Sequence, residues 1–171
     1  MRPILIFCFV FLVGMACRAE ESALMPEIVL KRIDALGARK AVNEYIDTPA
    51  WATILRGIRS GEPTWLKVFS KLRAGSDAGA SEDLALALFE AIPAKPFEVI
   101  PVISREYHET TNQVCTFTFE AEMPAGGINR YLSRIENALR QAATETERKI
   151  AAECLSGVKA TREAFYDDTN Y

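Results

Sequence analysis

Histidine is almost absent from this sequence, since His108 is the only one among 171 residues. Catalytic mechanisms and metal sites that require two histidines are therefore excluded. Glu106 and Glu109 lie close to His108, but positions 106 and 108 would point to different faces of a helix. We interpret His108 as a surface residue and expect no metal ion and no cofactor.

Motifs for nucleophilic catalysis and for phosphate binding are also missing. Neither Ser76 nor Ser81 lies in Gly-x-Ser-x-Gly, the sharp turn that exposes a catalytic serine. The glycine-containing stretch 75–79 lacks the lysine of a phosphate-binding P-loop. The sequence therefore identifies no catalytic residue, and we expect the protein not to be an enzyme.

Positive charge is not concentrated in any part of the chain. The 20 basic side chains are outnumbered by 23 acidic ones, and the densest basic stretch, residues 31–40, is interrupted by Asp34. Binding a polyanion requires a clustered basic face. Nucleic acid is therefore not expected as a partner.

Long hydrophobic runs are limited to one, near the start of the sequence. Residues 4–13 are all apolar, follow Arg2 and precede small residues that end at Ala19. This combination is typical of a signal peptide, and the run is shorter than the ~20 residues of a membrane-spanning helix. We expect residues 1–19 to be removed. Residues 20–171 then form a single helical domain, periplasmic or secreted, with no transmembrane segment.

Cysteine is scarce, with four residues, and no Cys-x-x-Cys redox motif occurs. Cys8 and Cys17 would leave with the signal peptide, and the remaining pair, Cys115 and Cys154, is expected to form a disulfide. Cleavage after Ala16 is the alternative, because it would expose Cys17 for lipidation. The residues before this cysteine match a bacterial lipobox only in part. Membrane anchoring is expected only if Cys17 is lipidated.

Apolar residues recur at helical spacing along most of the chain. Prolines that suit a first helical turn and glycines that suit a helix end divide the pattern into short segments. The short connections imply antiparallel hairpins. We therefore expect a mostly α fold, in which helical hairpins pack as a short solenoid-like or orthogonal bundle. The expected helices begin near positions 26, 38, 49, 63, 81, 96, 128 and 144.

Two features of the C-terminal third have alternative interpretations. Residues Val114 to Phe119 alternate β-branched and aromatic side chains, which predicts one short extended segment, either a strand or an irregular stretch held by Cys115. Thr144 and Glu147 have the spacing of a capping box, which would begin a separate last helix. One continuous helix from position 128 to about position 165 is the competing interpretation.

A group of motifs in the stretch 51–100 resembles small exported helical-hairpin proteins of Gram-negative bacteria. The motifs are Trp51, Ser60-Gly61-Glu62-Pro63-x-Trp65-Leu66, Asp77-Ala78, Leu86-Ala87-Leu88, Pro93, Pro96 and Val99-Ile100. The resemblance implies an exported helical-hairpin fold and transfers no catalytic residue. Some small periplasmic helical proteins are immunity proteins, which bind and block a toxic hydrolase.

The predicted function is that of a non-enzymatic protein-binding module with one protein partner, such as an immunity or inhibitor protein that blocks a secreted effector. An envelope-associated structural or adaptor (lipo)protein is one alternative, and an enzyme whose site the sequence conceals is another. Polar side chains near helix ends are the candidates for partner contact, because connections often carry binding residues. The candidate residues are Asp47, Glu62, Asp83, Glu106, His108 and Glu109.

Overall fold

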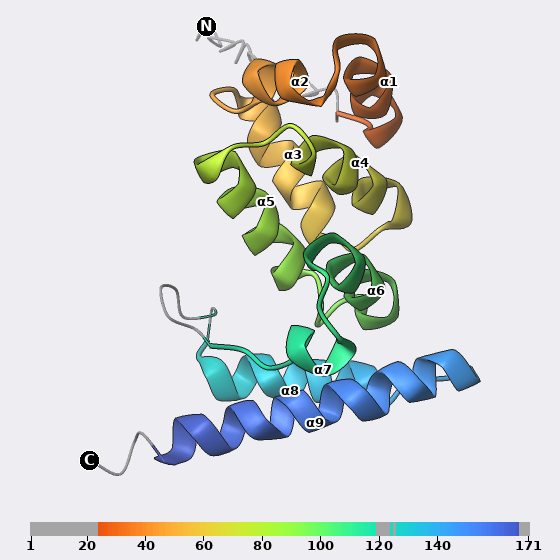
Figure 1. Ribbon diagram of the computed structural model, residues 1–171, viewed down its shortest axis with the longest axis vertical. Helices are drawn as coiled ribbons and strands as arrows, with labels where there is room; N and C mark the ends of the chain where they lie inside the picture. Colours follow the sequence, from red (N-terminus) through yellow and green to blue (C-terminus); the bar gives the residue numbers. More distant parts are fainter. Residues whose placement is uncertain (1–23, 119–123, 125, 168–171) are drawn as a thin grey trace, which may run out of the picture.

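Helices form most of the part of the chain that the computed structural model describes, which comprises residues 24–118, 124 and 126–167 (Figure 1). These residues contain nine α-helices and no β-strand, so the predicted mostly α fold is confirmed. The helices are α1 (Pro26–Leu36), α2 (Ala38–Tyr45), α3 (Pro49–Arg59), α4 (Pro63–Arg73), α5 (Ala78–Glu90), α6 (Pro96–Tyr107), α7 (Thr111–Val114), α8 (Ile128–Leu139) and α9 (Glu145–Asp167).

Proline and glycine set several helix boundaries, as the sequence predicts. Pro26, Pro49, Pro63 and Pro96 each lie in the first turn of a helix, where a missing N–H group costs nothing. Between α1 and α2 the chain turns at Gly37, whose φ of 81° is favoured only by glycine. The predicted starts of α1 to α4 and of α6 are confirmed.

Helix α5 does not begin near position 81 as predicted, and the residue before α3 does not cap that helix through its side chain. Helix α5 begins at Ala78, so Ser81 lies inside the first turn, where its hydroxyl oxygen is 2.6 Å from that of Ser76. The Thr48 hydroxyl does not cap α3 but donates to the Tyr45 carbonyl at 2.7 Å. Each hydroxyl has a nearby polar partner that competes with the helix N–H groups.

Helix α4 lies at the centre of the N-terminal bundle, in contact with α1, α2, α3, α5 and α6 (Figure 1). Its Val68, Phe69 and Leu72 are completely buried. Full burial of an apolar side chain of this size stabilises a fold by roughly 1.5–3 kcal/mol. The short hairpins from α1 to α6 are therefore held together by one apolar interior.

Helices α8 and α9 form an antiparallel pair that lies across the end of this bundle (Figure 1). The predicted capping box begins α9, because the Glu147 N–H donates to Thr144 Oγ1 at 3.2 Å and the Glu147 carboxylate accepts from the Thr144 N–H at 2.8 Å. The N–H groups of Thr144 and Ala143, which both donate to this carboxylate at 2.8 Å, hold the pKa of Glu147 below its ordinary value. The last two helices are separate, and the alternative of one continuous helix is wrong.

The segment from Val114 to Phe119, predicted to be extended, contains no strand among its described residues. Val114 is the last residue of α7, and residues 116–118 follow without regular secondary structure. A second capping box starts α7, since Thr110 Oγ1 accepts from the Gln113 N–H and the Gln113 side chain accepts from the Thr110 N–H. The cap accounts for the helical conformation of Val114, and residues 116–118 agree with the alternative interpretation of an irregular stretch held by Cys115. Phe119 lies outside the described residues.

The predicted disulfide is confirmed. Cys115, directly after α7, is bonded to Cys154 of α9, with 5.1 Å between the two Cα atoms, and both residues are completely buried. Gly157 lies at the same contact, where a Cβ atom would be only 2.5 Å from the Asn112 carbonyl oxygen. Helices α7 and α9 can approach this closely because position 157 has no side chain.

The predicted signal peptide, residues 1–19, lies outside the described residues. Cleavage after Ala19 and the alternative lipidation of Cys17 therefore stay predictions. Within the described ranges, none of the helices combines the length and the apolar character needed to cross a membrane.

Gly157→Ala is expected to destabilise the protein, although alanine is normally preferred to glycine in a helix by about 1 kcal/mol. The added methyl group would overlap the main chain at Asn112 and Cys115, so α7 would have to move. Gly79→Ala is the matched control, because nothing lies within 4 Å of a Cβ atom at that helical position, and it should stabilise the protein. Urea denaturation measures both effects. Stabilisation by Gly157→Ala would contradict the close contact between α7 and α9.

Candidate functional site

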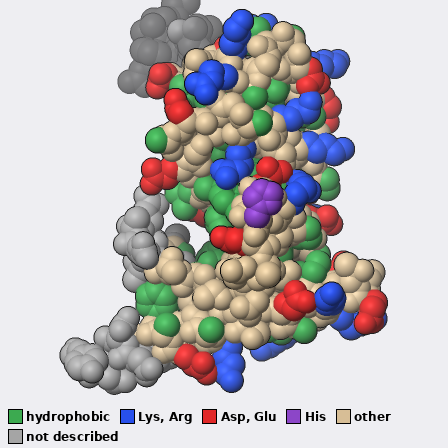
Figure 2. All heavy atoms as spheres, in the orientation of Figure 1, with side chains coloured by type: hydrophobic (Ala, Val, Ile, Leu, Met, Phe, Trp, Pro, Cys, Tyr) green, Lys and Arg blue, Asp and Glu red, His purple; other side chains and the backbone are tan. Residues whose placement is uncertain are grey.

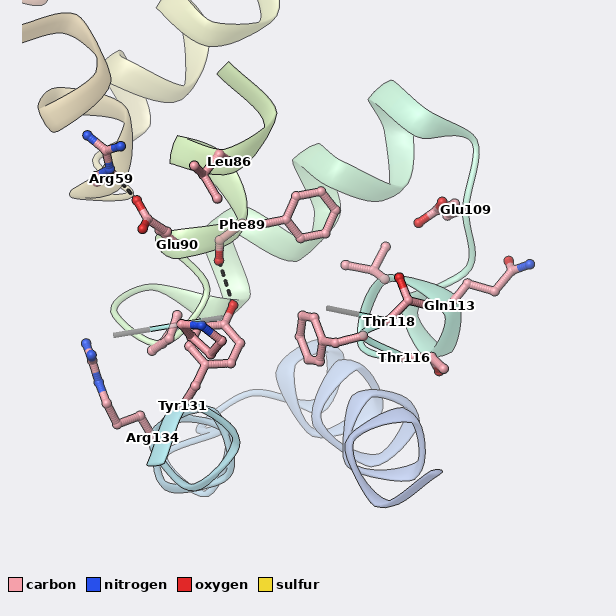
Figure 3. A pocket seen from close by; sticks show the side chains of 14 residues that line it. Arg59, Leu86, Phe89, Glu90, Glu109, Gln113, Thr116, Thr118, Tyr131 and Arg134 are labelled. Carbon is pink, nitrogen blue, oxygen red and sulfur yellow. Dashed lines mark hydrogen bonds and ion pairs between the residues drawn. The ribbon is translucent and has the colours of Figure 1, made fainter. Parts of the chain in front are cut away.

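A cleft of about 680 Å³ lies between the N-terminal bundle and the C-terminal helices. Figure 2 shows a hollow at this level of the molecule, with hydrophobic side chains around it. The ends of α3 and α5, together with α8, form one side, and α7 and residues 116–118 form the other (Figure 3). The lining residues are Arg59, Leu86, Phe89, Glu90, Pro93, Glu109, Gln113, Val114, Thr116, Phe117, Thr118, Pro124, Tyr131 and Arg134.

Helix α5 is apolar on two faces, and only one of them belongs to the core. Leu84 and Leu88 are completely buried, whereas Leu86 and Phe89 line the cleft. Leu86 is 37% exposed, which makes it one of three large hydrophobic side chains left exposed in the described part of the chain. An apolar face that the core does not cover is typical of an interaction site.

Three aromatic side chains of the cleft are held in place by their neighbours. The Tyr131 hydroxyl donates to the Phe89 carbonyl at 2.9 Å, which ties α8 to the end of α5. Phe117 meets Tyr131 edge-on, with ring centroids 5.5 Å apart and an interplanar angle of 82°. Phe89 packs against Tyr107 at a centroid distance of 6.0 Å. Rings that are already ordered lose little further freedom when a ligand binds.

Charged groups surround the Tyr131 hydroxyl. Glu90 forms an ion pair with Arg59 from the end of α3, and Arg134 follows Tyr131 by one helical turn. Burial raises the pKa of Tyr131 above its ordinary value, the Glu90 carboxylate raises it further, and Arg134 opposes these two effects. The charges of Glu90 and Arg134 therefore both act on the Tyr131 hydroxyl. This hydroxyl is neutral at physiological pH.

Polar side chains line the side of the cleft opposite the arginines. Figure 3 shows Glu109, Gln113 and Thr116 on this side, on and around α7. The Phe117 N–H, at the end of the same wall, donates to Thr161 Oγ1 of α9 at 2.9 Å. This hydrogen bond and the disulfide fix the wall to α9.

Three of the six residues predicted to contact a partner lie at the two ends of α3. Asp47 is exposed before α3 and Glu62 is exposed after it, so a helix of 11 residues, about 16 Å long, separates them. Glu62 pairs with Lys95 at 3.4 Å. Asp83 lies at the Asp47 end, because its carboxylate accepts a hydrogen bond from Trp51 Nε1 at 2.8 Å.

The other three predicted contact residues lie at the end of α6. Glu106 pairs with Arg105 at 3.1 Å. His108 is exposed and ends α6 in a left-handed conformation, with a φ of 58°. Glu109 lines the cleft, and none of the other five predicted residues does.

Most of the residues that line the cleft escape prediction from the sequence. Leu86 and Phe89 have the helical spacing of core residues, and they share α5 with true core residues. The available signal was that every residue from Leu84 to Phe89 is apolar, so α5 carries more apolar surface than a single core-facing stripe needs. Arg59 and Arg134 carry no such signal, because helix packing alone brings them to one site.

The cleft offers aromatic surfaces and charges, and its polar groups have structural roles. The Thr116 hydroxyl donates to the Asn112 carbonyl at 2.9 Å. Across the described ranges, no group of three or more His, Cys, Asp or Glu side chains is placed to hold a metal ion. Comparison of the chain with protein-family models, curated proteins and solved structures finds no match. Any inference about function therefore starts from the chemistry of the cleft.

Tyr131→Phe is expected to lower the free energy of unfolding at pH 7 by about 1 kcal/mol, because the Phe89 carbonyl loses one of its hydrogen bonds and keeps the one from the Ile92 N–H. Because the pKa of Tyr131 is raised in the folded protein, the hydroxyl proton of Tyr131 is released at a lower pH from the unfolded chain than from the folded one. The parent therefore loses stability as the pH rises above 10. The variant lacks this loss. The difference between the two proteins should therefore shrink in urea denaturation at higher pH.

Tyr107→Phe is the control for this experiment at pH 7. Its ring would keep the contact with the Arg73 guanidinium, which lies 4.0 Å from the ring centroid, and its buried hydroxyl has no hydrogen-bond partner among the described residues. A smaller loss of stability is expected. If the difference between Tyr131→Phe and the parent did not change with pH, the account of Tyr131 would be wrong.

Proposed function

We propose that this protein is a non-enzymatic binding module of the periplasm that holds one protein partner in the cleft, as an inhibitor or immunity protein holds a secreted effector. The observation that carries the proposal is the cleft itself. Its aromatic walls are ordered before any partner arrives, and a leucine remains exposed on one of them. A site of this kind binds without the cost of ordering its own walls.

The size and composition of the cleft suit a segment of a protein. Its volume of about 680 Å³ lies within the roughly 300–1,000 Å³ of small-molecule and cofactor sites, so it would take a few side chains of a partner and not a whole element. Aromatic residues and arginine are enriched at the centres of protein interfaces, where they contribute most of the binding energy. Phe89, Tyr131 and Arg134 provide both kinds of side chain here.

The polar groups of the cleft favour binding over turnover. A catalytic hydroxyl needs a base within hydrogen-bond reach. The Tyr131 hydroxyl instead donates to a backbone carbonyl, and Arg59 is engaged by Glu90. His108 does not line the cleft. These observations support a stoichiometric complex.

Export rests on the sequence and is supported by the cysteine chemistry. The predicted signal peptide directs the chain out of the cytoplasm. Disulfides persist in oxidising compartments such as the periplasm, and the bond between Cys115 and Cys154 fits that setting.

Leu86→Arg is expected to weaken partner binding at least about tenfold, because it places a charge and extra bulk on the apolar wall of the cleft. The free energy of unfolding should fall by only about 1 kcal/mol, because Leu86 is 37% exposed and part of its apolar contact is lost. The partner is captured from envelope extract with the purified parent, identified by mass spectrometry, purified and titrated against each variant. Light scattering then gives the stoichiometry, which should be one to one.

Ile28→Arg is the matched control, because Ile28 is a 56% exposed hydrophobic residue of α1 that does not line the cleft. Charge reversal at Asp47 and Asp83 tests the predicted acidic contacts separately. If these reversals abolish binding and Leu86→Arg does not, the interface lies at the start of α3 instead. Turnover of a cell-wall or lipid substrate by the purified protein alone would refute the proposal.

A further inference from the structure

One side of the cleft carries more positive than negative charge. Arg59 and Arg134 both lie on this side, and the one carboxylate with them is Glu90, beside Arg59 (Figure 3). The ion pair between Arg59 and Glu90 neutralises one of the two guanidinium charges. The net charge of this group of three is +1, in a protein whose acidic side chains outnumber its basic ones by 23 to 20.

Arg134 carries the charge that is left over. It is exposed, lines the cleft and forms no ion pair or side-chain hydrogen bond within the described part of the chain. Arg162 of the adjacent α9 differs, because it binds three side chains of α8, those of Asn129, Ser133 and Glu136. The hydrogen-bond donors of Arg134 are therefore available to a ligand.

The aromatic surfaces of the cleft adjoin this charge. Arg134 lies one helical turn after Tyr131, whose ring contacts Phe117 and whose hydroxyl binds the Phe89 carbonyl. The rings and the guanidinium line the same cleft, so one ligand that spans the cleft can contact both.

We propose that the cleft recognises an extended peptide segment of the partner in which an acidic side chain lies next to an aromatic or aliphatic one. The carboxylate binds Arg134, and the apolar side chain packs against Phe89 and Phe117. This inference rests on the proposed function, because it names the chemistry of the segment that occupies the same cleft.

A carboxylate matches this side of the cleft better than a phosphate group does. One carboxylate balances the net charge of +1, whereas a phosphate group carries nearly two negative charges and would also face Glu90. The planar guanidinium binds a carboxylate through two parallel hydrogen bonds, which adds geometric specificity. An acidic peptide is therefore favoured over a phosphorylated one.

A display library of random heptapeptides, selected on the disulfide-bonded parent protein, tests the proposal. The enriched peptides should share Asp or Glu within two positions of an aromatic or aliphatic residue. One enriched peptide and its Asp→Asn or Glu→Gln form are then synthesised and titrated by fluorescence anisotropy. The amide form should bind the parent at least about tenfold more weakly, since a charge-assisted hydrogen bond is lost.

Arg134→Gln should bind the acidic and the amide peptide equally weakly. Arg140→Gln is the matched control and should behave as the parent does, because Arg140 is exposed at the end of α8 and does not line the cleft. Three outcomes would each overturn the proposal. The selected peptides could show no acidic enrichment, the selection could enrich no peptide, or the preference for the acidic peptide could persist in Arg134→Gln. If Leu86→Arg still abolishes binding of the protein partner in that event, the carboxylate is wrong but the proposed function stands.

Discussion

The disulfide between Cys115 and Cys154 joins a helix of four residues, α7, to one of 23 residues, α9. A single helical turn is not stable alone, so α7 depends on this bond and on the close approach at Gly157. Closing the loop between the two cysteines, which are 39 residues apart, contributes about 4 kcal/mol on the chain-entropy model. Gln113 and Phe117 lie within two residues of Cys115, and the same bond therefore positions one wall of the cleft.

Tyr131 joins that wall to the rest of the molecule. Its ring packs edge-on against Phe117, and its hydroxyl binds the carbonyl of Phe89 at the end of α5. Burial keeps this hydroxyl protonated, so the hydrogen bond persists at physiological pH. The two walls are thus connected through one side chain of α8, and the space between them keeps a defined shape.

Two features of the cleft add little to the stability of the isolated protein. Leu86 keeps apolar surface in water, and Arg134 has no carboxylate partner in the described chain. Neither the exposed leucine nor the unpaired arginine is explained by core packing, because α5 contributes Leu84 and Leu88 to the core. The proposed bound segment would cover the leucine and neutralise the arginine. The acidic positions at the ends of α3 lie outside this site, and Glu109 is the predicted residue that lines it.

The sequence by itself determined the helical hairpins and the disulfide. Proline, glycine and the Thr144 capping box act within a few residues, and two cysteines remain once the predicted signal peptide is set aside. It misled at Val114, which ends a capped helical turn instead of beginning a strand, and at Leu86 and Phe89, whose spacing is that of core residues. The cleft was decided by the tertiary structure alone. Arg59, Phe89, Phe117 and Arg134 come from separate parts of the chain, and whether an apolar residue of α5 is covered depends on which helices pack against it. Periodicity shows that a face is apolar, but it does not show whether the fold leaves that face uncovered.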